Sequence, residues 1–290
     1  MSVPIVVGVD GSTSAQAAVK WAAQEAARHR VPLKLVHAYL VPGRGYPEIV
    51  LTGHEVRRAL EEQGRQWLAE AEAVVRDVAP EVEVSVALEH SGAAGAMVWE
   101  SKRARTVVLG SRGLGGFSGV LIGSVAVAVS AHGECPVVVV RDALPETGPV
   151  VVGVDGSPAS ERAVEFAFEA ASMRDAPLVA VIAGNDVAVD SAFGSPLAVD
   201  WDRIEEDERV VLAERLAGWQ ERYPDVEVER VVVRDRPVRA LLKFADRAQL
   251  LVVGSRGRGG FKGMLLGSTS QTLVYHAPCP LAVVRPPAAD

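Results

Sequence analysis

The chain has 290 residues, of which 49% are hydrophobic and only 5% aromatic, and its length favours two domains, each large enough to bury a core. A net charge of −7 and the lack of a Lys/Arg run give a nucleic-acid or anionic-membrane surface little support. No run of about 18 apolar residues occurs, so no membrane insertion is expected, and two cysteines are too few for a disulfide framework, which favours a cytoplasmic setting.

Short Val-rich runs alternate with helix-length segments along the chain. The opening residues, MSVPIVVGVDGS, have no basic leader, and Gly8 and Asp10 interrupt their apolar run, so they predict a first strand rather than a signal peptide. Continuous apolar runs predict strands that are covered on both faces, as in a parallel sheet. These runs are 3–9, 33–39, 82–88, 105–110 and 136–141, then 149–154, 177–183, 226–233, 249–254 and 280–285.

Helix signals fall between these runs. Ser12 or Ser14 can cap a helix at 15–29, and Pro158 follows Ser157 at a favoured first-turn position. Segments 54–78 and 201–222 keep apolar residues at helical spacing. Core or interface packing is expected for the tryptophans, which are Trp21, Trp67, Trp99, Trp201 and Trp219. Each half therefore predicts the order βαβαβαβαβ, an open, doubly wound, parallel sheet of five strands.

The two halves of the chain repeat one another. Residues 5–30 match 150–175 at an offset of 145, and a block from Thr106 matches one from Leu250 at an offset of 144. The stretches 40–53 and 184–200 share almost nothing and are predicted to be loops. The segment DALPETG, from Asp142 to Gly148, has the composition of an exposed connector. We therefore expect two tandem α/β domains, residues 1–142 and 148–290.

A glycine spacing occurs once in each half. Its members are Gly110, Gly113 and Gly123-Ser124 in the first half and Gly254, Gly257 and Gly267-Ser268 in the second. The first two glycines follow the fourth strand, at the sheet edge where open α/β folds bind ligands. The Gly-Ser pair lies near the start of the last helix, whose free N–H groups favour an anion. Arg112 and Arg256 could add positive charge, or could be solvated loop residues. The alternative for the whole motif is a glycine-rich turn without a ligand.

An aspartate ends the first strand of each half, in the sequence GVDGS at 8–12 and 153–157. Asp10 and Asp155 would lie at the same edge as the glycine loop, where a carboxylate can accept hydrogen bonds from ribose hydroxyls or an adenine amine. Gly8 and Gly153 leave room for close backbone approach. An Asx-turn or a helix cap would use the same aspartates without a ligand, but together with the loop they favour a ligand site.

With both motifs present, the whole chain resembles a tandem universal stress protein of the ATP-binding subclass. The signature of that family, G-2x-G-9x-G-S/T, is matched in both halves, and the strand-one aspartate is also typical of it. The resemblance implies Rossmann-like, adenine nucleotide alpha hydrolase-like domains that bind ATP, with Mg²⁺ on the phosphates and no metal-binding side chains. It further implies an internal pseudo-dimer through the fifth strands at 137–141 and 281–285. A homodimer and regulatory protein partners are also expected.

The family's binding roles carry over residue by residue. In the first half they fall on Gly8, Asp10, Gly110, Ser111, Arg112, Gly113, Leu114, Gly115, Gly116, Gly123, Ser124 and Val125. In the second half they fall on Gly153, Asp155, Gly254, Ser255, Arg256, Gly257, Arg258, Gly259, Gly260, Gly267, Ser268 and Thr269. The ends of the second strands, at Ala38 and Ala183, would border the adenine. A Gly110→Ala, Gly254→Ala double variant is expected to weaken phosphate contact without unfolding the domains, on the assumption of a positive φ.

Other motifs fail. No G-x-x-x-x-G-K-[ST] occurs, and no G-x-G-x-x-G follows the first strand, so a P-loop ATPase and an NAD site are disfavoured. The pairs His132-x-x-Cys135 and His276-x-x-Cys279 offer two ligands each where a structural zinc needs four, which favours cysteine as a small core residue.

The predicted function is an ATP-binding regulator of the stress response or of growth, with no assigned catalytic residue. One alternative is a weak ATPase or nucleotidyl-transfer enzyme, in which Asp10 or Asp155 orients a metal or water. The other is an interaction scaffold whose ATP is structural.

Overall fold

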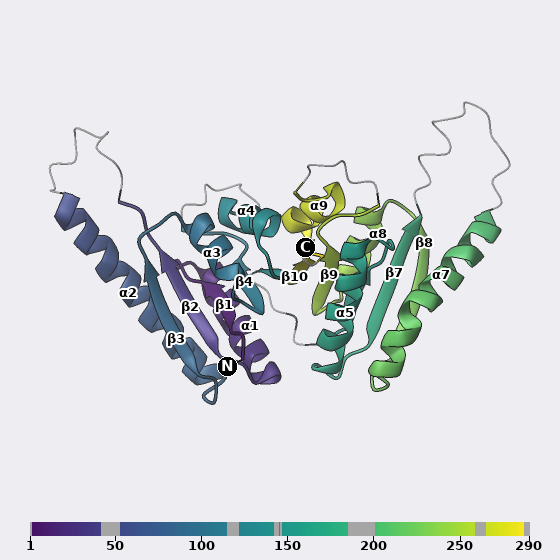
Figure 1. Ribbon diagram of the computed structural model, residues 1–290, viewed down its shortest axis with the longest axis horizontal. Helices are drawn as coiled ribbons and strands as arrows, with labels where there is room; N and C mark the ends of the chain where they lie inside the picture. The colour runs from purple at the N-terminus through teal and green to yellow at the C-terminus, as the bar shows by residue number, and fades with distance from the viewer. Residues whose placement is uncertain are drawn as a thin grey trace, which may run out of the picture. The chain divides into compact units, whose positions relative to one another are not determined.

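The chain folds into two compact units, Met1–Ala143 and Leu144–Asp290 (Figure 1). The computed structural model describes residues 2–41, 53–114, 122–141, 145, 147–184, 201–258 and 265–286. Within these residues each unit has five strands, with a helix between each strand and the next. The predicted alternation of strands and helices is confirmed in both halves.

The first unit is a doubly wound parallel sheet. Its elements are β1 (Ile5–Gly8), α1 (Thr13–His29), β2 (Leu33–Ala38), α2 (Gly53–Val78), β3 (Val84–Glu89), α3 (Ala93–Ser101), β4 (Thr106–Gly110), α4 (Ser124–His132) and β5 (Val137–Val140). The strands lie in the order β3-β2-β1-β4-β5 and are all parallel, with Ile5 opposite both Leu33 and Thr106. The strand order reverses between β1 and β4, which is where such sheets bind ligands.

The second unit has the same topology. Its elements are β6 (Val150–Gly153), α5 (Pro158–Ser172), β7 (Leu178–Gly184), α7 (Trp201–Arg222), β8 (Val228–Arg234), α8 (Pro237–Ala245), β9 (Leu250–Gly254), α9 (Ser268–His276) and β10 (Leu281–Val284). The order β8-β7-β6-β9-β10 is again parallel, with Val150 opposite Leu178 and Leu250. The switch point lies between β6 and β9.

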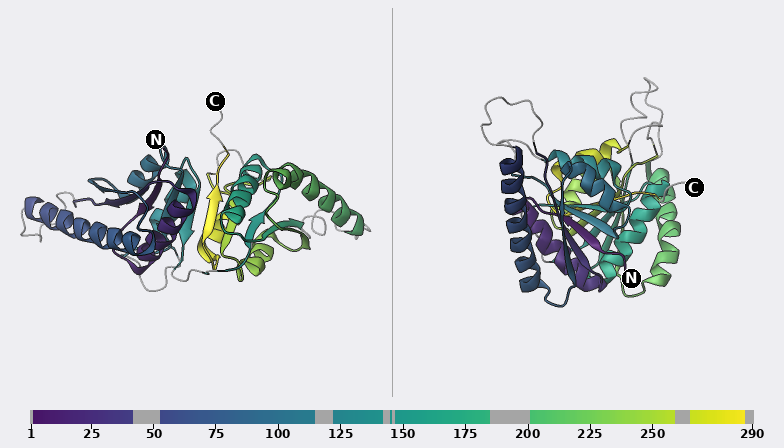
Figure 2. Two further views of the ribbon diagram at one scale, coloured as in Figure 1. Left: turned by 90° about the horizontal axis from the view of Figure 1, so that it is seen from below. Right: turned by 60° about the vertical axis from the view of Figure 1, so that its left-hand side comes forward.

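Helices cover both faces of each sheet, as the views of Figure 2 show. In the first unit α1 packs with α2, and α3 packs with α4; in the second, α5 packs with α7 and α8 with α9. Strands between two helical layers bury both of their faces, and every residue of β5 and β10 is buried. The continuous Val runs therefore follow from double coverage. None of the described helices is both long and apolar enough to cross a membrane.

The helix after each first strand begins at a serine cap. Ser12 Oγ accepts the Ala15 N–H at 3.1 Å, and Ser157 Oγ accepts the Ser160 N–H at 3.2 Å, with Pro158 at the first helical position. Ser12 is therefore the cap of α1. Ser14, the other candidate, lies within the first turn of α1.

The burial of the cysteines and tryptophans can be compared with the core positions predicted for them. Cys135 and Cys279 are buried, while His132 and His276 are exposed, so the interpretation of cysteine as a core residue is confirmed. Burial raises the pKa of Cys135 to about 12, which leaves its thiol protonated at neutral pH.

Trp21 is buried, but Trp99 is 58% exposed, so Trp99 is not a core residue and its alternative role in an interface stays a prediction. Instead the cations of Lys102 and Arg103 lie 5.3 and 5.9 Å from its ring centre. Helical spacing alone does not separate this face of α3 from its buried face.

Candidate functional site

The two strand-one aspartates tie the turn after the strand to the glycine loop. Asp10 Oδ1 accepts the Ser12 N–H at 3.0 Å and the Ser12 hydroxyl at 2.6 Å. Its Oδ2 accepts the backbone N–H of Leu114 at 3.2 Å. The Asx-turn is therefore present, and the second oxygen of the same carboxylate faces the loop.

Asp155 repeats this arrangement in the second unit. Its Oδ1 accepts the Ser157 N–H at 3.0 Å and the Ser157 hydroxyl at 2.7 Å, and its Oδ2 accepts the Arg258 N–H at 3.2 Å. The turn between strand and helix passes through a glycine in the left-handed region, Gly11 at φ 82° and Gly156 at φ 73°. A side chain at this position would be strained, which explains the second glycine of each GVDGS sequence.

The first glycines of the loop signature are required by close packing. A Cβ on Gly110 would lie 2.6 Å from the Ser14 carbonyl carbon, and one on Gly254 would lie 2.8 Å from that of Ala159. Neither glycine has a positive φ. The expectation that alanine at both positions would spare the fold therefore does not hold, because the added methyl meets helix backbone.

The second glycine of each signature lies against the carboxylate of the strand-one aspartate. A Cβ on Gly113 would lie 2.6 Å from Asp10 Oδ2, and one on Gly257 would overlap Asp155 Oδ2. The first glycine of the motif thus fits against the helix after β1 or β6, and the second fits against the aspartate carboxylate.

The loop ends at the start of the last helix. The Gly123 N–H donates to the Ser111 carbonyl at 2.7 Å, and the Gly267 N–H donates to the Ser255 carbonyl at 2.8 Å. Gly123 and Gly267 are the N-caps of α4 and α9, with no side-chain cap. The first N–H groups of each helix have no acceptor within the helix, and the helix dipole is positive there, so this end suits an anion.

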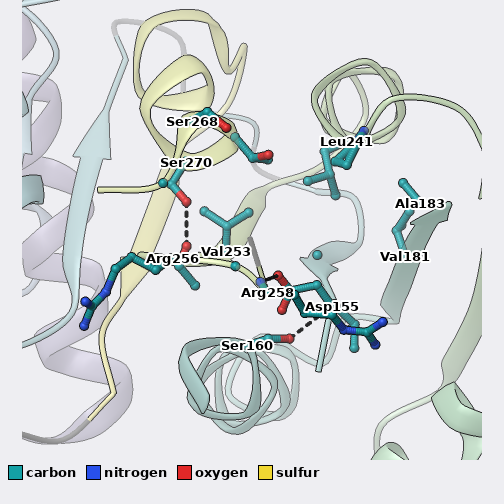
Figure 3. Close-up of a pocket in the computed structure, with 17 residues that line it drawn as sticks. Asp155, Ser160, Val181, Ala183, Leu241, Val253, Arg256, Arg258, Ser268 and Ser270 are labelled. Carbon is teal, nitrogen blue, oxygen red and sulfur yellow. Dashed lines mark hydrogen bonds between the residues drawn. The ribbon is translucent and has the colours of Figure 1, made fainter. Parts of the chain in front are cut away.

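The second unit holds a cavity of about 490 Å³ at its switch point (Figure 3). Asp155 lies at one side, Val181, Ala183 and Leu241 at another, and Ser268 and Ser270 of α9 at a third. The Ser270 hydroxyl donates to the Gly254 carbonyl at 2.6 Å, which fastens the first turn of α9 to the end of β9. The cavity thus combines a carboxylate, an apolar wall and a helix N-terminus.

Most of the residues predicted for the second site line this cavity. They are Gly153, Asp155, Ala183, Gly254, Arg256, Gly257, Arg258, Gly267, Ser268 and Thr269. Ser255 is only 1% exposed and is not among the lining residues. Gly259 and Gly260 lie outside the described residues, as do Gly115 and Gly116 of the first unit.

In the first unit Gly8, Ala38 and Gly110 end their strands at the same carboxyl edge as Asp10. Ser124 is exposed at the start of α4. The side chain of Val125 packs against the hydrophobic core of the first unit. The predicted loops at 40–53 and 184–200 fall largely outside the described residues.

Further lining residues were missed from the sequence: Val154, Ser160, Val181, Pro237, Leu241, Val253 and Ser270. For two of these residues the sequence contained a signal that could have placed them in the site. Val181 lies two residues before Ala183 on the same face of β7, and Ser270 completes the first turn of α9. Pro237 and Leu241 come from α8, and no motif in α8 links it to the site.

Arg256 does not direct its charge into the cavity. Its side chain points away from Asp155 and Ser268 in Figure 3. Burial lowers the pKa of Arg285, and the positive charge of Arg256 is a second cause, so the Arg256 guanidinium lies on the side of Arg285. Arg256 lines the cavity, but the local positive charge suggested for it lies elsewhere.

The two loops are braced differently. Ser14 Oγ accepts the Arg112 N–H at 3.2 Å and lies 3.3 Å from Ser111 Oγ. The second unit has Ala159 at the position of Ser14, and the Ser255 hydroxyl is buried with no hydrogen-bond partner among the residues the structure describes.

Ala159→Ser is expected to raise the free energy of unfolding by about 1 kcal/mol, because it gives the Ser255 hydroxyl the partner that Ser111 has. Ser14→Ala should lower it by about the same amount. Guanidinium denaturation measures both. A destabilised Ala159→Ser variant would contradict this account of the loop.

A charged network lies at the end of β2 in the first unit. The Tyr39 hydroxyl donates to Glu61 Oε1 at 2.6 Å, and the Arg57 Nε–H donates to the same atom at 2.8 Å. These two bonds, that of Tyr39 first, lower the pKa of Glu61 to about 2. Tyr39 follows Ala38 directly, so the network flanks the predicted adenine side of the first site.

We expect Tyr39→Phe to weaken the dependence of unfolding on acid pH. The folded-state pKa of Glu61 is depressed, so its carboxylate stabilises the fold above the usual pKa of 4.5, and this stabilisation is lost as pH falls toward 2. Acid titrations followed by circular dichroism should show a shallower loss of stability in that window for Tyr39→Phe and for Glu61→Gln. A slope equal to that of the unmodified chain would contradict the linkage.

The fold and the site together define a class: doubly wound α/β domains whose switch point combines a strand-one aspartate with a G-2x-G-9x-G-S loop. The model of the universal stress protein family matches residues 1–141 and 146–285. The chain belongs to the universal stress protein family, a family of stress-response proteins, and carries two of its domains in tandem.

Two relatives support this assignment, and a solved structure shares the fold. The chain is 43% identical over 292 residues to universal stress protein Rv2623 of Mycobacterium tuberculosis (strain ATCC 25618 / H37Rv), covering 98% of this chain and 97% of that protein. It is 42% identical over 294 residues to a universal stress protein of Mycolicibacterium smegmatis, covering 97% of each. The crystal structure of a universal stress protein from Archaeoglobus fulgidus DSM 4304 has the same fold, with a TM-score of 0.70, 20% identity and coverage of 98% and 99%.

Proposed function

We propose that this protein is an ATP-binding regulator of the stress response, with one nucleotide site at the switch point of each unit. The cavity of the second unit carries the proposal. Its volume of about 490 Å³ lies within the range of about 300–1,000 Å³ that is usual for small-molecule sites. A ligand with an apolar ring, hydroxyls and an anionic tail matches the three kinds of wall.

Each wall suits one part of ATP. Val181, Ala183 and Leu241 would take the adenine ring, because all three are apolar and line one side of the cavity. Asp155 would accept hydrogen bonds from ribose hydroxyls. The backbone of the glycine loop and the first turn of α9 would hold the phosphates, since uncapped N–H groups and the helix dipole favour negative charge.

The first unit offers the matching parts in Ala38, Asp10, Gly113 and Ser124. No group of three or more His, Cys, Asp or Glu side chains among the described residues could hold a metal. Mg²⁺ would therefore be held through the ATP phosphates, where it neutralises part of their charge.

The hydrogen bonds of the aspartates support binding over hydrolysis. Both oxygens of Asp155 accept hydrogen bonds from the protein, from Ser157 and from the Arg258 N–H. A general base must reach the proton it abstracts and have a free lone pair directed at it. Asp155 already accepts three hydrogen bonds from the protein, and a carboxylate offers about four lone pairs. The remaining lone pair is the one that a ribose hydroxyl would take, so we assign no hydrolytic step to Asp155.

Regulation would follow from nucleotide contacts with both the glycine loop and the last helix. The loop and the last helix are separate elements that meet at Gly267, where the N–H bonds the Ser255 carbonyl. A nucleotide that contacts both would hold the loop against the helix, and its release would free the loop for a protein partner. Nucleotide occupancy would thus set the shape or the assembly of the protein.

Calorimetry of the full chain with Mg²⁺ and ATP tests the proposal, and mass spectrometry of co-purified small molecules supports the assignment of the ligand. Gly123→Ala is the variant of choice in the first site. Among the described residues, an added Cβ there meets nothing closer than 3.6 Å, so the fold tolerates it, while the methyl lies at the phosphate end of the site. We expect binding that this variant weakens. Absence of heat at millimolar ATP would rule the proposal out.

A further inference from the structure

The rim of the second cavity carries a cation that the first unit lacks. Arg258 lines the cavity beside Asp155 (Figure 3). Its N–H donates to Asp155 Oδ2 at 3.2 Å, and Leu114 makes the same bond to Asp10 Oδ2 at 3.2 Å. The two sites therefore hold this position by the same backbone contact and differ in the side chain, arginine in one and leucine in the other.

A second guanidinium lies next to that of Arg258. A Cβ on Gly156 would lie 2.7 Å from Nη2 of Arg215 and 3.0 Å from Nη2 of Arg258, so both groups crowd the same turn. In the first unit the matching turn at Gly11 is covered by the indole of Trp67. The turn beside the second site thus carries two guanidinium groups where the matching turn of the first unit carries an indole, and of the two arginines Arg258 lines the cavity.

The two guanidinium groups differ in their ion pairing. Arg215 is ion-paired with Glu161, but in the described part of the chain no carboxylate is ion-paired with Arg258. The nearby N-terminus of α5 adds the positive end of a helix dipole. An anionic group bound in the cavity would relieve this concentration of positive charge, and an uncharged ligand would not.

We propose that Arg258 is a specificity-determining residue, which makes the second site select nucleoside polyphosphates over the uncharged nucleoside. The first site, with Leu114 in place of Arg258 and the indole of Trp67 at the adjoining turn, discriminates less between them. This inference rests on the proposed function, because it concerns the ligand of the same site. It assigns different nucleotide preferences to two domains whose backbones are alike.

The opposing account is that the Arg258 guanidinium packs flat on the base. Such packing would strengthen binding of the nucleoside and the nucleotide equally, because both carry the base. Comparison of ATP with adenosine therefore separates charge selection from packing on the base.

The experiment is calorimetry of the full chain with Mg-ATP and with adenosine, at low and at high ionic strength. We expect Arg258→Leu to weaken ATP binding at one of the two sites about tenfold, to leave adenosine affinity within about twofold, and to reduce the salt dependence of ATP binding. Leu114→Arg should do the reverse at the other site. Arg209→Leu is the matched control, because it removes the same charge from the exposed surface of α7, where Arg209 pairs with Glu205.

Either of two results with Arg258→Leu overturns the inference alone: unchanged ATP affinity, or equal losses of affinity for ATP and for adenosine. An equal loss in Arg209→Leu would assign the effect to net charge and would also overturn it. A chain that binds no nucleotide overturns the proposed function and this inference together, so the two failures are distinguishable. Arg258 is exposed, and circular dichroism confirms that each variant is folded.

Discussion

Gly254→Ala is expected to lower the free energy of unfolding of the second unit by about 3 kcal/mol, at the upper end for an overpacked site. The added Cβ would lie 2.8 Å from the Ala159 carbonyl carbon and 2.9 Å from the Ser160 nitrogen. Both atoms belong to the first turn of α5, and backbone cannot turn aside as a flexible side chain can. Helix α5 would have to move away from β9, against which it packs.

Hydrogen–deuterium exchange read by mass spectrometry measures this loss unit by unit, so the first unit is an internal reference. Gly218→Ala is the matched control, since a Cβ at that position in α7 meets no described atom within 4 Å. Alanine in place of a glycine in a helix should stabilise the second unit by about 1 kcal/mol. If the amides of β9 exchange at the same rate in Gly254→Ala as in the unmodified chain, α5 accommodates the methyl group without a loss of stability.

The fold was predictable because pattern and repetition agree. Strands sandwiched between helices are apolar at every position, so the Val runs mark them, and the second copy shows which runs belong to the fold. The boundaries are less certain from sequence: β3 is observed at Val84–Glu89 where 82–88 was expected. At this outer strand two of the six residues are exposed, so the apolar run ends less sharply there.

The backbone of the site was predictable and its side-chain surroundings were not. Gly110, Gly113 and Asp10 converge because the loop after β4 and the turn after β1 meet at one switch point. In contrast, Leu241 reaches the cavity from α8, and only packing decides which face of a helix lines a cavity. The direction of Arg256 likewise depends on where Arg285 and its neighbours lie, which no local pattern encodes.

The sequence similarity of the two halves also made it hard to predict which side-chain differences between them matter. Ser14 against Ala159 is a one-atom change in an otherwise repeated block, yet it decides whether the serine that opens the loop has a partner. Trp67 and Arg215 cover equivalent turns from helices whose sequences share little. A repeat identifies shared backbone contacts, and structure is needed to see where side chains diverge.

Asp155→Ala is expected to lower the free energy of unfolding by about 2–3 kcal/mol, because hydrogen bonds to charged groups are the stronger ones and Asp155 accepts three. The Ser157 hydroxyl and two backbone N–H groups lose their acceptor together. Nucleotide binding to the second site should be lost as well. Stability alone therefore cannot tell whether the carboxylate serves the turn or the ligand.

Asp155→Asn separates the two roles. Asparagine keeps the oxygen that accepts hydrogen bonds from Ser157, so the Asx-turn survives. Its NH₂ group replaces Oδ2, so it faces the Arg258 N–H and cannot accept a hydrogen bond from a ribose hydroxyl. We expect a loss of stability of about 1 kcal/mol with a loss of ATP affinity of at least about tenfold, measured by denaturation and calorimetry on the same preparation. An Asn variant that binds ATP as the unmodified chain does would assign Asp155 to the turn alone. The same substitution of Asp10 tests the first site, where the three bonds are repeated.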